Sequence, residues 1–247
     1  MQLHVESAGL GKDVVLLHGW GMHGGCWDAV SVALSRKYRL HRVDLPGHGS
    51  SRYEVGDWVD ALAETFPFEV CVCGWSLGGQ LALEWASRYP ERVARLALLS
   101  STPCFVARAG WAHGISRELF MTFQEGLETD MAETLRRFLF LQAQGGEDEK
   151  RLFRQLQKNM KETEKEGLRR GLDLLYDNDL RLKAKSVIQP ALVLQGEGDR
   201  LTPLDAGKWL AENMRDAEMA AIRGCSHAPL LSHPDFCVSK LSEFLDG

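Results

Sequence analysis

The chain has 247 residues, enough for one substantial hydrophobic core, and α/β domains of this length commonly remain a single folding unit. Its formal net charge of -5 lacks the basic excess that is typical of nucleic-acid-binding proteins. The sequence has neither a signal-like amino-terminal segment nor an apolar run as long as a membrane span. We therefore expect a cytoplasmic monomer that binds neither nucleic acid nor membrane.

The six cysteines are scattered along the chain, without C-x-x-C or Cys/His ligand spacing. Cys71 and Cys73 alternate within a predicted buried strand, where free thiols pack as small apolar side chains. This pattern favours buried free thiols over disulfides or a metal site. We predict neither a metal nor a cofactor.

The first part of the chain predicts two strands that each end in a glycine-containing turn. Residues 14–17 form a continuous apolar run, typical of a strand covered on both faces in a parallel sheet, and His18-Gly19-Trp20-Gly21 follows directly. After helical spacing over residues 27–34, residues 38–43 predict a second strand, which leads into the Pro/Gly loop of residues 44–51. Three polar residues of these turns are interpreted as structural: His18, Asp44 and His48.

Gly74-Trp75-Ser76-Leu77-Gly78 links a predicted strand to a predicted helix. Residues 68–73 form an apolar run rich in Val and Cys, and residues 80–88 have helical spacing. Glycines on both sides of Ser76 permit a close approach of strand and helix, which would present the serine hydroxyl at the tip of a strained turn. We interpret Ser76 as a nucleophile. The alternative is an ordinary glycine-rich connection.

Two backbone N–H groups are candidates for stabilising an oxyanion beside Ser76. Leu77 stands at the amino terminus of the predicted helix, where N–H groups are free and the helix dipole is positive. Trp20 stands in the His-Gly-x-Gly turn, the place where α/β-hydrolases supply a second donor. We predict an oxyanion hole formed by the Trp20 and Leu77 N–H groups.

The chain changes character after a strand predicted at residues 93–100. Between residues 104 and 182 it is charge-rich with helical periodicity, and a strand pattern returns at residues 189–196. We interpret residues 104–182 as a helical cap inserted into a core made of residues 1–103 and 183–247. The predicted fold class is α/β, with the mostly parallel, helix-flanked sheet of the α/β-hydrolases.

Two further polar residues follow strands late in the chain. Asp199 lies in an acidic loop after the resumed strand, and His227 precedes an apolar terminal helix. A serine hydroxyl needs a base within hydrogen-bonding reach and a group that orients this base. We predict that Ser76, Asp199 and His227, in the chain order of α/β-hydrolases, form a catalytic triad. Glu197 is the alternative partner of the histidine.

Several blocks spread over most of the chain combine these motifs with parts of the cap: His18–Gly21, Asp44–Gly47, Gly74–Gly79, Pro103–Arg108, Arg137–Gln142 and His227–Pro234. Together they resemble the pimeloyl-[acyl-carrier protein] methyl ester esterases of biotin synthesis. The resemblance implies a serine carboxylesterase that hydrolyses the methyl ester of a pimeloyl chain attached to acyl carrier protein. It also implies a set of substrate contacts: Trp20, Ser76, Leu77, Phe138, Leu139, Phe140, Leu141, Gln142 and His227.

Because acyl carrier proteins are acidic, the resemblance also implies a basic docking surface near the cap. The candidates are the cations of the cap: Arg136, Arg137, Lys150, Arg151, Arg154 and Lys158. Lys150, Arg154 and Lys158 are spaced to share one helix face. The alternative is a solvated face, since glutamates alternate with these cations.

Other enzymes with a serine triad share the same motifs. They include a general short-acyl carboxylesterase, a carbon–carbon hydrolase that acts on vinylogous diketones, and the related lyase of menaquinone synthesis. A different class is a ligand receptor that keeps the hydrolase fold but turns substrate over slowly. Ester hydrolysis over many turnovers distinguishes the enzymes from the receptor.

Overall fold

The computed structural model describes every residue from Met1 to Gly247, and its centre is a seven-stranded sheet with the order β1-β3-β2-β4-β5-β6-β7. The strands are β1 (His4–Ala8), β2 (Lys12–Leu17), β3 (Tyr38–Asp44), β4 (Val70–Trp75), β5 (Val93–Leu99), β6 (Ala191–Gly196) and β7 (Ala217–Ile222). Only β1 pairs antiparallel with its neighbour, and all other adjacent strands are parallel. The mostly parallel sheet of the predicted α/β class is confirmed.

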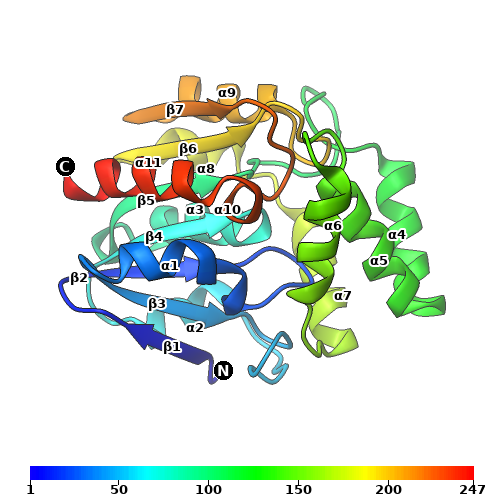
Figure 1. Cartoon of the computed structure of the whole chain (residues 1–247), viewed down its shortest axis with the longest axis horizontal. Coiled ribbons are helices and arrows are strands. Elements are labelled where there is room, and N and C mark those ends of the chain that lie inside the picture. The colour runs from blue at the N-terminus through cyan, green and yellow to red at the C-terminus, as the bar shows by residue number, and fades with distance from the viewer.

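Helices cover both faces of the sheet (Figure 1). One face carries α1 (Asp28–Leu34), α10 (Pro229–Ser232) and α11 (Pro234–Asp246), and the other carries α2 (Trp58–Thr65), α3 (Leu77–Arg88), α8 (Arg181–Ser186) and α9 (Leu204–Asn213). Short 3-10 turns occupy Gly24–Trp27 and Pro90–Arg92. No helix combines the length and the apolarity that a bilayer crossing requires.

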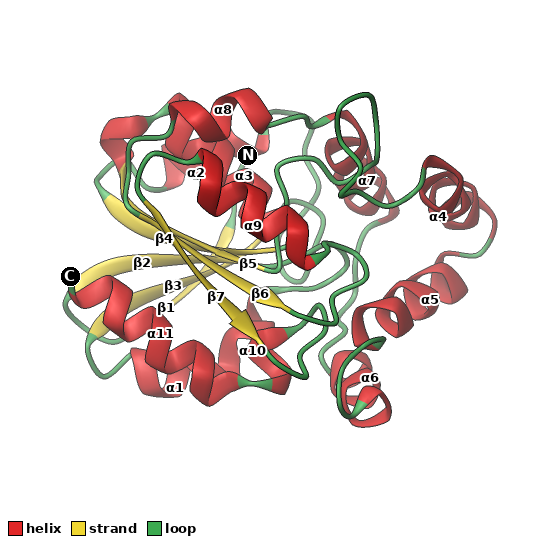
Figure 2. Cartoon of the chain, turned by 90° about the horizontal axis from the view of Figure 1, so that it is seen from above, coloured by secondary structure: helices red, strands yellow, loops and turns green.

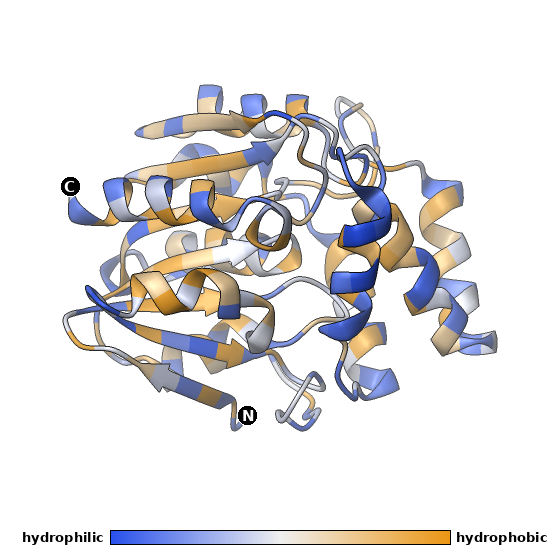
Figure 3. Cartoon of the chain, viewed as in Figure 1, coloured by the Kyte–Doolittle hydropathy of each residue, from blue (hydrophilic) through white to orange (hydrophobic).

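The continuous apolar runs are explained by burial on both sides of the sheet. In β2, Val15 and Leu17 join the hydrophobic cluster on one face, whereas Val14 and Leu16 join the cluster on the other. The central strands are accordingly hydrophobic along most of their length (Figure 3). A strand with two buried faces has no polar alternation, so its sequence reads as an unbroken apolar segment.

Four helices gather beyond the carboxyl ends of the strands, on one side of the molecule (Figure 2). They are α4 (Arg117–Thr129), α5 (Met131–Ala143), α6 (Glu149–Lys158) and α7 (Lys165–Asp177). We propose that residues 104–182 form the cap. Because α8 begins at Arg181 and packs against α3, the carboxyl boundary of this cap falls within the first turn of a core helix.

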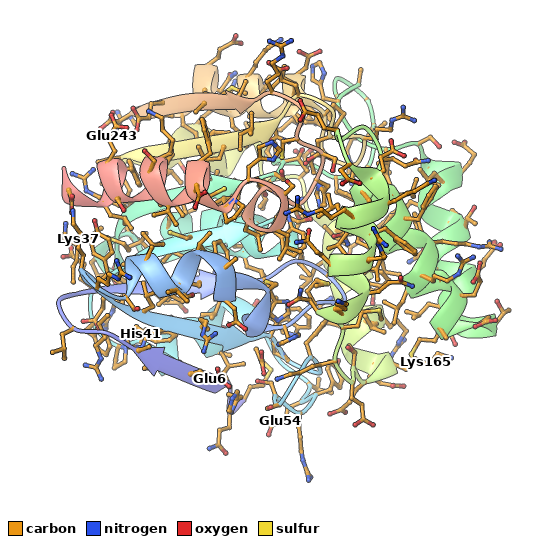
Figure 4. All side chains as sticks on the ribbon, viewed as in Figure 1. Glu6, Lys37, His41, Glu54, Lys165 and Glu243 are labelled. Atoms are coloured by element: carbon orange, nitrogen blue, oxygen red, sulfur yellow. The ribbon has the colours of Figure 1, made fainter.

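Charged side chains lie on the outside of both parts. Lys37 forms an ion pair of 2.8 Å with Asp246, which fastens the end of α11 to the core. Lys165, at the start of α7, lies on the cap side of the molecule, far from Lys37 (Figure 4).

All six cysteines are free and buried. Burial raises the pKa of the Cys73 thiol, so this side chain stays protonated and packs as an apolar group.

Candidate active site

Ser76 is the single residue between the end of β4 and the start of α3. Its backbone has φ 56° and ψ -116°, a conformation that non-glycine residues rarely adopt. The turn is possible because β4 and α3 approach at glycines: a side chain on Gly74 would overlap the carbonyl oxygen of Gly78. The strand, turn and helix predicted around Ser76 are thus present, and the turn holds the hydroxyl at the carboxyl edge of the sheet.

The structure brings Ser76, His227 and Asp199 together. Ser76 Oγ lies 2.9 Å from His227 Nε2, and His227 Nδ1 lies 2.9 Å from Asp199 Oδ2 and 3.1 Å from Oδ1. The three residues are at most 5% exposed. In this geometry the imidazole can accept the serine proton while the carboxylate holds its other nitrogen. Glu197, the alternative partner, is exposed and makes no hydrogen bond to the histidine.

A compact turn fixes the Asp199 carboxylate. Its Oδ1 accepts hydrogen bonds from the Leu201 and Thr202 N–H groups at 2.9 and 3.0 Å, and its Oδ2 accepts one from the Thr202 hydroxyl at 2.7 Å. The amide of Gln195, at the end of β6, also contacts Oδ2 at 3.3 Å. Sequence reasoning missed Thr202, although a threonine three residues after an aspartate is a recognisable turn pattern.

The backbone of His227 is held from two sides. Its N–H donates to the Gln142 carbonyl of α5 at 3.1 Å, and its carbonyl accepts a bond of 2.7 Å from the Trp75 indole at the end of β4. The histidine is therefore positioned jointly by the core and by the helices above it. The Gln142 contact passes through a main-chain oxygen, which no residue pattern encodes.

Two unpaired backbone donors lie beside Ser76. Leu77 is the first residue of α3, where N–H groups have no intrahelical acceptor. The Trp20 N–H has no backbone or side-chain acceptor, and the turn that contains it touches the serine: a side chain on Gly19 would lie 3.2 Å from Ser76 Cβ. This placement is compatible with an oxyanion hole made of these two groups.

His18 and His48 are buried in the loops behind this turn. His18 Nδ1 lies 2.8 Å from the Gly19 carbonyl, and its Nε2 accepts the Leu45 N–H at 2.9 Å, so the ring joins two loops. Burial lowers the pKa of His18 to about 3, helped by the neighbouring His48, and burial lowers the pKa of His48 to about 4. Both rings are neutral near pH 7, and neither contacts Ser76.

Asp44 takes part in the same loops. Although burial acts to raise its pKa, hydrogen bonds from the Ser50 and Gly24 N–H groups lower it. The carboxylate closes the loop that follows β3, with bonds of 2.6 Å from Gly24 and 2.8 Å from Ser50. The contacts of Asp44, like those of the two histidines, are those of a loop-stabilising residue.

Trp20 joins the core to the cap. Its indole N–H donates to the Leu168 carbonyl of α7 at 2.8 Å, and its ring meets Phe138 of α5 edge to face with centroids 4.8 Å apart. The ring fits against α7 at Gly171, where a side chain would lie 2.7 Å from it. Trp20 and Phe138 form an apolar wall on the cap side of the site.

The five consecutive residues 138–142 do not share one face, because successive residues of an α-helix point about 100° apart. Phe138 and Leu139 are buried on the two sides of α5, Leu141 is half-buried, and Gln142 is buried beside His227. Phe140 is 46% exposed and packs against Phe153 of α6. The structure therefore places Phe140 on a different side of α5 from Phe138, although the resemblance implies both as substrate contacts.

The basic residues of the cap fall into two groups. Arg136 and Arg137 both bind Glu133, at 2.6 and 2.9 Å, and these bonds lower the pKa of Glu133 to about 2. The cations of α6 are exposed and form no ion pair: Lys150, Arg151, Arg154 and Lys158. No group of three or more His, Cys, Asp or Glu side chains is arranged to hold a metal ion.

A mostly parallel sheet with a serine at a sharp strand-to-helix turn defines the α/β hydrolase class. Residues 14–240 match the model of the Alpha/beta hydrolase family. The solved structure of an esterase from Exiguobacterium antarcticum has the same fold, with a TM-score of 0.90 at 21% identity, covering 99% of this chain and 96% of that one.

Two curated relatives narrow the family. The pimeloyl-[acyl-carrier protein] methyl ester esterase of Nitrosomonas europaea is 43% identical over 96% of this chain and 97% of its own length. The protein of the same name from Nitrosospira multiformis is 41% identical over 99% and 98%. The chain belongs to the pimeloyl-[acyl-carrier protein] methyl ester esterase family, and it is a carboxylic ester hydrolase. The resemblance to this family that the sequence motifs indicated is confirmed.

Proposed function

We propose that this protein hydrolyses the methyl ester of a pimeloyl chain carried on acyl carrier protein, releasing methanol, in biotin synthesis. The relatives named pimeloyl-[acyl-carrier protein] methyl ester esterase align with nearly the whole chain, which supports this substrate assignment. The observation that carries the mechanism is the 2.9 Å separation of Ser76 Oγ from His227 Nε2 within a buried site.

In the proposed first step, Ser76 Oγ attacks the ester carbonyl carbon while its proton passes to His227 Nε2. The Trp20 and Leu77 N–H groups stabilise the oxyanion, and Asp199 stabilises the imidazolium without taking its proton. When the carbonyl re-forms, the bond to the methoxy oxygen breaks and His227 returns the proton, so methanol leaves. The pimeloyl group is then esterified to Ser76.

Water completes the reaction by the same route. It attacks the acyl-enzyme carbonyl, giving one proton to His227, and the bond to Ser76 Oγ breaks as the serine takes that proton back. The product carries a free carboxylate at the end of the acyl chain. We propose that Trp20, Leu77, Phe138 and Gln142 surround the reacting end of this chain, since apolar walls suit an alkyl segment.

We further propose that the carrier docks on the cap through Lys150, Arg151 and Arg154, with Arg137 at the margin. The α6 cations support this proposal because none of them forms an ion pair with a carboxylate of the chain. Arg137 shares Glu133 with Arg136, so its charge is less available to a partner.

The proposal is tested by measuring methanol release from the methyl ester of carrier-bound pimelate. Four kinds of alternative substrate are assayed in parallel: free dimethyl pimelate, nitrophenyl esters, a vinylogous diketone and a menaquinone precursor. The Ser76→Ala variant is the control. We expect the highest kcat/KM for the carrier-bound ester, over many turnovers, and none for the variant. Faster conversion of the diketone or the menaquinone precursor would refute the proposal.

A further inference from the structure

An aromatic pair, Phe140 and Phe153, lies on the outer side of the cap. The two rings meet edge to face with centroids 6.0 Å apart, one from α5 and the other from α6. Phe140 is 46% exposed, although full burial of a phenylalanine contributes about 1.5–3 kcal/mol. The cap therefore leaves a large part of this apolar ring in contact with solvent.

Phe140 of the aromatic pair faces away from the wall around Ser76. Phe138, two residues before Phe140, packs against Trp20 on the inner side of α5. Residues two apart in an α-helix point about 200° apart, so Phe140 lies on the opposite side of the helix. The ring is not part of the wall around the reacting atoms.

Unpaired cations border the aromatic pair on α6. Lys150 stands three residues before Phe153 and Arg154 directly after it, and neither forms an ion pair. The side of α6 seen in Figure 3 is predominantly hydrophilic. Acidic residues at the start of α6 are engaged locally: Asp148 accepts from the Arg151 N–H and Glu149 from the Gly145 N–H.

Resting on the proposed function, we propose that the aromatic pair is the apolar centre of the docking surface for the acyl carrier protein. Protein interfaces commonly place aromatic side chains at the centre and polar groups at the rim. Lys150 and Arg154 supply a basic rim for an acidic partner. A second copy of the chain fits less well, because a two-fold contact centred here would bring the same cations close together.

The test compares Phe140→Ala with the matched variant Phe68→Ala. Phe68 is 45% exposed and pairs edge to face with Phe66, with ring centroids 6.2 Å apart. It lies just before the amino-terminal end of β4, whereas the cap lies beyond the carboxyl ends of the strands. Both variants and the unmodified protein are assayed with a carrier-bound pimeloyl methyl ester and with free dimethyl pimelate. Sedimentation velocity reports self-association.

We expect Phe140→Ala to lower kcat/KM for the carrier-bound ester about tenfold, through KM, with unchanged kinetics on the free diester. Phe68→Ala should match the unmodified protein on both substrates. The docking contact alone would be overturned by any of three outcomes. These are equal losses of kcat/KM on both esters, no loss on either ester, or a dimer that Phe140→Ala dissociates. Failure of the unmodified protein to hydrolyse the carrier-bound ester would overturn the proposed function as well.

Discussion

The proposed role of Ser76 depends on how firmly the residues around it are held. Its own conformation, φ 56°, is set by the packing of β4 against α3, and the His227 ring is fixed by Asp199. Asp199 is itself held by the backbone and hydroxyl of Thr202. Geometry of this kind lets a weak nucleophile act at neutral pH without rearrangement.

Replacing Asp199 by Asn tests the orienting group. The amide has the shape of the carboxylate but would favour the wrong histidine tautomer, so we expect kcat for a nitrophenyl ester to fall by about 10⁴-fold. The matched variant is Glu197→Gln, which should retain kcat because Glu197 is exposed and does not touch the histidine. A larger loss in Glu197→Gln than in Asp199→Asn would reverse the assignment.

The sequence predicts the three side chains of the proposed triad but not the groups that hold them in place. Ser76, Asp199 and His227 each follow a strand, so the common edge of a parallel sheet brings them together. The Gln142 carbonyl, which accepts the His227 N–H, lies on a cap helix whose position depends on tertiary packing. The family resemblance implies both Phe138 and Phe140 as substrate contacts, but a block of matching residues does not show which face of a helix each side chain takes.

The cap helices and the core approach each other closely at a pair of glycines, Gly145 and Gly198. The turn between α5 and α6 touches the loop that carries Asp199: a side chain on Gly145 would overlap the Gly198 carbonyl. Together with the bond from His227 to α5, this contact ties the cap to two residues of the proposed triad. The position of α5 and α6 should therefore affect the alignment of the site.

Replacing Gly145 by Ala tests this contact. We expect kcat to fall about tenfold on carrier-bound and free esters alike, because the displaced turn shifts the Asp199 loop. Gly110→Ala is the matched control: φ is 88° at Gly145 and 70° at Gly110, but the nearest atom to a new side chain at Gly110 is 3.5 Å away. Equal kcat in the two variants, at equal stability in urea, would show that the contact does not position the site.

The strands that the sequence shows as apolar runs are those with two buried faces, whereas β3, predicted at residues 38–43, is exposed at Arg39. β2, β4, β5 and β6 are fully or largely buried and read as apolar runs. β1 and β7 form the edges of the sheet, where mixed exposure leaves no such pattern. Within the helical region predicted at residues 104–182, α4 begins at Arg117, where the Ser116 side chain accepts the Leu119 N–H and caps the helix.

The buried pair His18 and His48 makes the stability of the whole molecule depend on pH. The folded protein keeps both rings neutral, with pKa values of about 3 and about 4 against the ordinary 6.5. Below 6.5 the unfolded chain takes up protons that the folded chain does not, so stability is lost as the pH falls. Each histidine contributes a slope of about 1.4 kcal/mol per pH unit in this window.

His48→Gln removes one of these groups while keeping a polar side chain. Between about pH 5.5 and 4.5, we expect the free energy of unfolding of the variant to fall less steeply than that of the unmodified protein, by about 1.4 kcal/mol per pH unit. Urea titrations at several pH values measure both slopes. Parallel slopes would show that His48 is already protonated in the folded state.

We propose that Ser76, activated by His227, is the nucleophile of this hydrolase. The most direct measurement is peptide mass spectrometry after reaction with a fluorophosphonate, followed during continuous turnover of the carrier-bound ester. We expect one adduct per chain, on Ser76, formed in step with the loss of ester hydrolysis and absent from Ser76→Ala. An adduct on another residue that abolishes activity, or full hydrolysis by Ser76→Ala, would contradict this role of Ser76.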